Sequence, residues 1–108
     1  MDEQTYLKLA DATFARIEDM FEDVDAAEVD CERSGDVLTL TFKNGKKCIV
    51  NTQRPTRQIW LAAGVNAWHF VHAPDRGDAW FDEKDPSREL LSTVSRVVKE
   101  QAGIDVSV

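Results

Sequence analysis

One stretch of the chain, Val37–Ala62, limits the possible folds more than any other. It opens with an unbroken run of apolar and β-branched residues, which is typical of a strand. Asn44 and Gly45 follow, and because both tolerate positive φ the pair predicts a tight hairpin. Lys46–Val50 is then the returning strand, and Pro55 must lie outside a central strand. The sequence therefore predicts antiparallel sheet in the middle of the chain.

The next strand, Gln58–Ala63, raises a functional question. Alternation places Ile59 and Leu61 on one face of this strand, with Gln58 and Trp60 on the other. One alternative is that Trp60 points into the core. The other is that helices cover the opposite face, so that Trp60 stands on an open surface which a partner would cover.

Amphipathic helices are expected at both ends of the chain. Residues 4–24 carry apolar side chains at three- and four-residue spacing, as one face of a helix requires. Asp85 is a suitable N-cap for the second helix, with Pro86 at its first position. This helix is expected to run to about Ala102, with Gly103 just beyond its end.

Further strands are expected at residues 28–33, 68–71 and 79–81, and the apolar tail 104–108 is expected to pack back on the domain. Short connections make neighbouring strands pair in antiparallel order. The prediction is an α+β two-layer sandwich, with the N- and C-terminal helices packed on one face of an antiparallel sheet of five to six strands. We expect residues 1–108 to form a single domain.

Charge is distributed very unevenly along the chain. The net charge is −7, but residues 1–32 hold eleven acidic and two basic residues, a local charge of −9. Such a field argues against nucleic acid as a partner and favours cations or a basic protein surface. No apolar run approaches the ~20 residues that span a membrane. The acidic N-terminus is unlike a secretory signal or an Arg-rich transit peptide, so we expect a cytoplasmic protein or a mature form that lacks its targeting segment.

The acidic residues of the first helix and first strand form a candidate metal-binding ridge. Carboxylates are hard oxygen ligands that suit Fe²⁺, Fe³⁺, Mn²⁺, Ca²⁺ and Mg²⁺, but no motif of a dedicated metal cage is present. One alternative is a solvated helix face; the other is a binding surface, favoured by like charges at i, i+4 near a helix C-terminus. The candidates are Asp11, Glu18, Asp19, Glu22, Asp23, Asp25, Glu28 and Asp30, with Glu32 as a further member.

Signs of catalysis are lacking in the sequence. No serine lies in a nucleophile elbow, and no glycine-rich phosphate loop is present. His69 and His72 fall on opposite faces of one strand, which argues against a two-histidine metal site. Cys31 and Cys48 are expected to be buried, reduced thiols. We therefore do not expect an enzyme.

Several of these residues together resemble the signature of the frataxin family, in its bacterial CyaY-like form. The order of the predicted elements is similar over nearly the whole chain. The motif is long and chemically mixed, so chance agreement is improbable. It comprises Asn51, Gln53, Pro55 and Gln58-Ile59-Trp60-Leu61-Ala62, preceded by Asp30-Cys31-Glu32 and followed by His69-Phe70.

The resemblance implies that iron (Fe²⁺ or Fe³⁺) binds weakly on the acidic ridge, where other divalent or trivalent cations could substitute. It also implies that the ridge and the face carrying Asn51, Gln53, Gln58 and Trp60 dock on the cysteine desulfurase of iron–sulfur cluster assembly. In that role the protein would supply iron or regulate assembly with other proteins of the pathway. By resemblance, His69 is an accessory contact for a metal or haem. A monomer is expected, with iron-dependent oligomers.

Two other functions remain open. The first is an acidic protein-interaction module in which metal binding is incidental. The second is iron oxidation or storage, a ferroxidase-like activity that needs a buried di-iron site. No Glu-x-x-His motif of the kind that builds such a site occurs in the chain.

Overall fold

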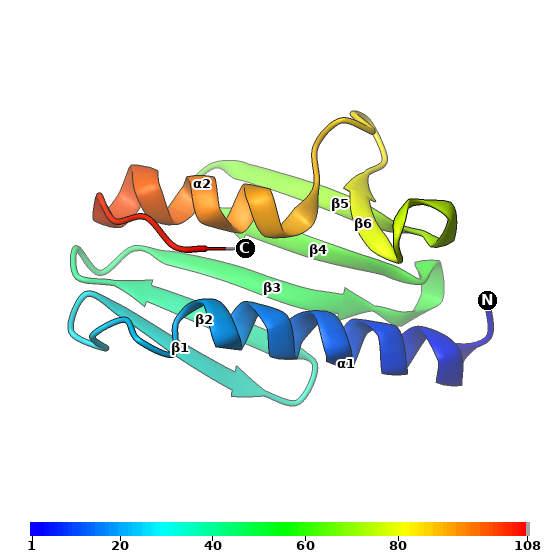
Figure 1. Cartoon of the computed structure of the whole chain (residues 1–108), viewed down its shortest axis with the longest axis horizontal. Helices are drawn as coiled ribbons and strands as arrows, with labels where there is room; N and C mark the ends of the chain where they lie inside the picture. The colour runs from blue at the N-terminus through cyan, green and yellow to red at the C-terminus, as the bar shows by residue number, and fades with distance from the viewer. Residues whose placement is uncertain (108) are drawn as a thin grey trace.

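Six strands lie side by side in chain order in the computed structural model, which describes residues 1–107. Each strand pairs with the next in antiparallel register. Both helices lie on the same face of this sheet (Figure 1). The predicted two-layer α+β sandwich is therefore confirmed. Its elements are α1 (Glu3–Met20), β1 (Val29–Ser34), β2 (Val37–Phe42), β3 (Lys47–Gln53), β4 (Gln58–Ala63), β5 (Asn66–Ala73), β6 (Ala79–Asp82) and α2 (Leu90–Ala102).

The core fills the space between the helices and the sheet. Ile59 and Leu61 are both 0% exposed, which confirms that this side of β4 faces the helices. Trp80 of β6 is also buried, and its Nε1 donates to Thr13 Oγ1 of α1 at 2.9 Å. Tyr6 packs edge-on to Trp80 with ring centroids 6.0 Å apart. Burying each large apolar side chain contributes roughly 1.5–3 kcal/mol, so this face is the main source of stability.

The hairpin between β2 and β3 forms as predicted from Asn44 and Gly45. Gly45 takes φ 84°, which glycine adopts without strain, and Asn44 Oδ1 accepts a hydrogen bond from the Lys46 backbone N–H at 2.9 Å. The returning strand is longer than expected, since it ends at Gln53 rather than Val50. It continues because its last residues pair with β4, where Asn51 lies opposite Trp60.

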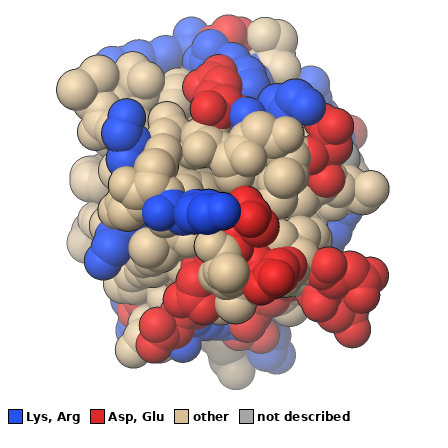
Figure 2. Space-filling model, turned by 90° about the vertical axis from the view of Figure 1, so that its left-hand side faces the viewer, with Lys and Arg blue, Asp and Glu red and all other residues tan. Residues whose placement is uncertain are grey.

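The first helix is shorter than predicted: it ends at Met20 rather than residue 24. The Phe21 N–H already bonds to the Glu18 carbonyl, and Glu22 and Asp23 lie in the turns that follow. The last turn of α1 contains no basic residue to offset the negative end of the helix dipole, so extending it with more acids would be unfavourable. Figure 2 views the end of the molecule at the left of Figure 1, where acidic side chains gather in the lower part.

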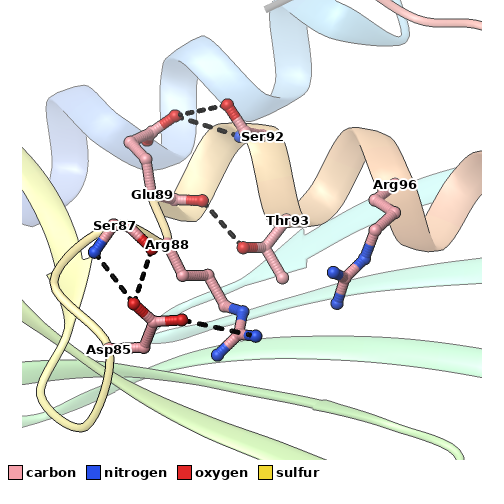
Figure 3. Close-up of a pocket in the computed structure, with 7 residues that line it drawn as sticks. All are labelled: Asp85, Ser87, Arg88, Glu89, Ser92, Thr93 and Arg96. Carbon is pink, nitrogen blue, oxygen red and sulfur yellow. Dashed lines mark hydrogen bonds and ion pairs between the residues drawn. The ribbon is translucent and has the colours of Figure 1, made fainter.

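The prediction for the start of the second helix was wrong. Asp85 does not cap it; α2 begins at Leu90, and the Glu89 side chain accepts hydrogen bonds from the N–H groups of Leu91 and Ser92. Figure 3 shows the contact between Glu89 and Ser92. Asp85 instead accepts from the N–H and hydroxyl of Ser87, which lowers the pKa of its carboxyl. The Asp-Pro pair thus builds a separate turn ahead of the helix, and the Arg88 N–H closes it by bonding to the Asp85 carbonyl at 2.9 Å.

The C-terminal segment packs back on the domain over the residues that the structure describes. Ile104 and Val106 are partly buried against the core, and Ser95 Oγ donates to the Val106 carbonyl at 3.0 Å. The predicted packing of Val108 lies outside the described residues. Across residues 1–107, neither helix combines the length and apolar character needed to cross a membrane.

Candidate metal-binding ridge and docking face

The acidic ridge wraps around the β1 edge of the sheet. Strand alternation turns Cys31 towards α1, whereas Asp30 lies on the open face and is exposed. Glu18 of α1 and Asp30 of β1 nevertheless line one hollow of about 260 Å³, together with Cys31. Acidic groups from the helix and from the strand therefore meet at this edge, as the sequence predicted for adjacent elements.

Within the ridge, Arg33 binds two of the predicted metal ligands. Its guanidinium pairs with Asp11 through Nη2, and its Nη1 lies 3.4 Å from Glu18 Oε1. The same group lies over the ring of Phe14, with Cζ 5.1 Å from the ring centroid. Sequence reasoning missed this arrangement. The sequence held part of the signal, because Asp11 and Glu18 share one helix face and alternation places Arg33 on the same side of β1 as Cys31, but the pairing itself depends on how β1 lies against α1.

Two further members of the ridge have partners of their own. Glu28 Oε1 lies 3.7 Å from Lys43 Nζ, and Asp25 Oδ1 accepts a hydrogen bond from the Ala27 N–H at 2.9 Å. The remaining candidates are exposed, and no Lys, Arg or His among residues 1–107 forms an ion pair with them. We call these the unpaired ridge acids: Asp19, Glu22, Asp23, Asp30 and Glu32.

The ridge suits weak cation binding rather than a caged metal. Among residues 1–107, no three His, Cys, Asp or Glu side chains converge closely enough to hold one ion. A cation here would therefore be held by one or two carboxylates and keep most of its water. Carboxylates still match the oxygen preference of hard cations, including iron. The donor set fits an ion that is picked up and released, not a resident structural metal.

The four predicted docking residues gather on the face of the sheet opposite the helices. Trp60 lies on this face, which decides between the two alternatives left by the sequence. Its Nε1 donates to Gln58 Oε1 at 2.8 Å. On the neighbouring strand, Gln53 Nε2 donates to Asn51 Oδ1 at 3.1 Å. The indole is half-buried and held by its neighbours, so it presents a fixed aromatic surface.

His69 and Glu83 complete the setting of Trp60. The His69 ring stacks on the indole with centroids 4.0 Å apart and an interplanar angle of 8°. Its Nδ1 lies 2.9 Å from Glu83 Oε2, and Gln58 Nε2 donates to the other oxygen of Glu83 at 3.3 Å. Only Nε2 of His69 is therefore left to contact a metal or haem. Glu83 was not among the predicted site residues, because no local pattern marks a contact between β4 and the segment after β6.

The cysteines and His72 lie apart from this face. Burial raises the pKa of Cys48 to about 12. Burial, with the nearby charges of Glu18 and Asp30, raises the pKa of Cys31 to about 11. His72 packs towards Trp80 on the helix side, so the two histidines do lie on opposite faces, as predicted. Because their pKa values lie far above neutral pH, the two cysteine thiols are protonated and unreactive there.

The fold and the acidic edge together define an α+β sandwich of the frataxin type, and comparison with known proteins agrees. A family profile described as "Frataxin-like domain" matches residues 1–104. The chain belongs to this family. It is 40% identical to the iron-sulfur cluster assembly protein CyaY of Aeromonas hydrophila over 103 residues, covering 95% of this chain and 94% of that one.

Other relatives give the same result. The CyaY protein of Ralstonia pickettii, also named an iron-sulfur cluster assembly protein, is 36% identical over 110 residues, covering 99% of this chain and 94% of its own. Among solved structures, a frataxin from Psychromonas ingrahamii superimposes with a TM-score of 0.89 at 32% identity, covering 99% of this chain and 97% of that one. The predicted family is thus confirmed.

Proposed function

We propose that this protein acts in iron–sulfur cluster assembly, the role for which its relatives are named. In this role it binds iron weakly on the acidic ridge and docks on the cysteine desulfurase. It thereby supplies iron or regulates assembly. The proposal rests on two observations: a group of exposed, unpaired ridge acids at the β1 edge of the sheet, and a fixed aromatic docking face around Trp60 of β4.

Iron is a cargo in this proposal. One or two carboxylates and water give a site with little selectivity and fast release. Like charges crowd together at the end of α1, so a bound cation relieves repulsion there. Because the ion then stabilises the folded state, iron binding should also raise the melting temperature.

The docking face is suited to a protein partner. Trp60 already has its N–H bonded and one ring face stacked, so little side-chain freedom is lost when a partner covers it. An aromatic anchor ringed by amides is a common composition at the centre of interfaces. The negative ridge would meet basic residues of the desulfurase, so binding should weaken as salt rises.

Binding to a purified cysteine desulfurase tests the docking surface. Trp60→Ala is expected to weaken binding at least tenfold, as truncation of an aromatic anchor does. Val65→Ala is the matched control, since Val65 is fully exposed at the turn between β4 and β5. Equal affinity of the Trp60→Ala and Val65→Ala proteins would refute docking through this face.

An anaerobic ¹⁵N–¹H NMR titration with Fe²⁺ tests the ridge. Selective broadening over residues 18–30 is expected, and uniform or absent broadening would refute iron binding there. The interaction module remains the second candidate, because no three ligands converge among residues 1–107. That function predicts desulfurase binding of the same strength with and without iron, whereas the proposed function predicts a difference.

A further inference from the structure

Arg33 is placed as an internal counter-ion of the ridge. It lies on the helix-facing side of β1, with its side chain 26% exposed. Asp11 and Glu18 are two helical turns apart on α1, and the guanidinium reaches both. Phe14 lies between them in the sequence, and its ring underlies the guanidinium. Arg33 is therefore held by two carboxylates and an aromatic ring.

We propose that Arg33 keeps metal cations away from Asp11 and Glu18 and confines them to the unpaired ridge acids. This inference deepens the proposed function, on which it rests. It makes Arg33 a residue that determines where on the ridge a cation binds, although it is itself no ligand. Of the three ridge acids on α1, Asp11 and Glu18 are thus occupied by a charge that the protein supplies from β1, and Asp19 is not.

The physical reason is competition for the same oxygens. A guanidinium is always charged, and its planar fork of N–H donors matches carboxylate oxygens better than a point charge does. A metal ion at Asp11 or Glu18 would have to displace this group while remaining close to its positive charge. A unit charge about 5 Å from a divalent ion in water weakens binding of that ion by roughly tenfold.

Within residues 1–107, the unpaired ridge acids lack such a counter-ion. Arg16 belongs to the same helix, and it lines a separate hollow of about 280 Å³ with Asp19 and Ser107. No ion pair joins Arg16 to Asp19 among residues 1–107, so this carboxylate remains open to a cation. Cation binding is therefore expected to concentrate at the C-terminal end of α1 and on β1, and to fade towards Asp11.

The test is a titration with Lu³⁺, a diamagnetic ion that prefers oxygen ligands, followed by the side-chain carboxyl ¹³C shifts. In the wild-type protein the unpaired ridge acids are expected to shift at lower Lu³⁺ than Asp11 and Glu18. In Arg33→Gln the midpoints of Asp11 and Glu18 are expected to fall roughly 30- to 70-fold, because the repulsion of a trivalent ion is one and a half times that of a divalent ion at the same distance. Arg96→Gln is the matched control, because Arg96 pairs with a carboxylate on α2, Glu100 at 3.6 Å. It should leave the ridge midpoints unchanged.

A second variant keeps the test decisive if Arg33→Gln folds poorly. Arg33→Lys retains the charge, so the midpoints of Asp11 and Glu18 should stay closer to those of the wild type. An Arg33→Lys protein that titrates like Arg33→Gln would overturn exclusion by charge. Wild-type midpoints that are equal along the whole ridge would overturn the inference too.

The inference and the proposed function can fail separately. If the unpaired ridge acids do not respond to Lu³⁺ in the wild-type protein, cation binding on the ridge fails. A response at Asp11 and Glu18 that appears only in Arg33→Gln would still show that Arg33 excludes cations. Conversely, a uniform response along the wild-type ridge supports cation binding and refutes the role of Arg33.

Discussion

Truncation of two adjacent residues of β4 should have different main effects: Ile59→Ala should chiefly lower stability, and Trp60→Ala should chiefly weaken binding to the desulfurase. Ile59 is 0% exposed in the core, so Ile59→Ala leaves a cavity and should lower the free energy of unfolding by about 3.5 kcal/mol. For a chain of 108 residues that corresponds to a fall of roughly 15 °C in the melting temperature. Trp60→Ala loses one hydrogen bond and one ring stack, which together are worth about 1–2 kcal/mol, or roughly 4–9 °C.

Thermal and urea unfolding measure the two effects directly. Ile59→Val, which removes a single methylene, should cost about 1 kcal/mol and calibrates the core. Binding to the desulfurase should show the reverse order, with Trp60→Ala much weaker than Ile59→Ala after correction for the folded fraction. If Trp60→Ala destabilises the protein as much as Ile59→Ala, then the separation of β4 into a structural side and a docking side is wrong.

Four further predictions concern stability and thiol chemistry. A cation at ten times its dissociation constant should raise the free energy of unfolding by about 1.4 kcal/mol, which raises the melting temperature by roughly 6 °C. In a thermal scan, amide substitution of the unpaired ridge acids should abolish this rise. At pH 8, iodoacetamide should alkylate Cys31 about 100-fold more slowly than a thiol of pKa 9.0, as mass spectrometry would show. Burial also raises the pKa of Cys48 from 9.0 to about 12. The stability that the protonated Cys48 thiol contributes is therefore complete below pH 9 and is lost as the pH rises towards 12. Cys48→Ala should make the free energy of unfolding, measured in urea, fall less steeply over this alkaline range. The buried Asp82 carboxylate lies 2.8 Å from the Arg88 guanidinium, and Arg88→Met removes this counter-ion. The free energy of unfolding in urea should fall by about 3–5 kcal/mol, and a fall below about 1 kcal/mol would contradict this.

Alternation along strands made the sheet and its two faces predictable from the sequence. The period of two placed Ile59 and Leu61 in the core, and the pattern also predicted the bounds of β4 as Gln58–Ala63. The Asn44-Gly45 hairpin formed because its signal is local: positive φ is needed in the turn and the sequence supplies it. The candidate docking residues followed from the same alternation, once the helices were expected on one face.

Competition between local signals limited the prediction of helix ends. Asp85-Pro86 is a helix start by composition, but Glu89 supplies the cap that α2 uses. The apolar spacing in residues 4–24 continues past Met20, yet the acidic last turn favours turns over further helix. Such choices depend on small energy differences, and tertiary contacts decide them.

Contacts between distant segments could not be read from the sequence alone. Arg33 meets Asp11 and Glu18 only because β1 lies beneath α1 at the edge of the sheet. Glu83 reaches His69 only because the chain leaves β6 beside β5. In both cases the residue types were visible in the sequence, but their partners depend on the folded topology.

Reconstituted cluster assembly tests the proposed function most directly. Purified cysteine desulfurase, a scaffold protein, cysteine and Fe²⁺ would be mixed with and without this protein, and cluster formation followed by its visible absorbance. The proposed function predicts that the initial rate changes when the protein is added, and that the change depends on the Fe²⁺ concentration and is lost in Trp60→Ala. An unchanged rate at every Fe²⁺ concentration, with the protein in excess, would contradict a role in cluster assembly.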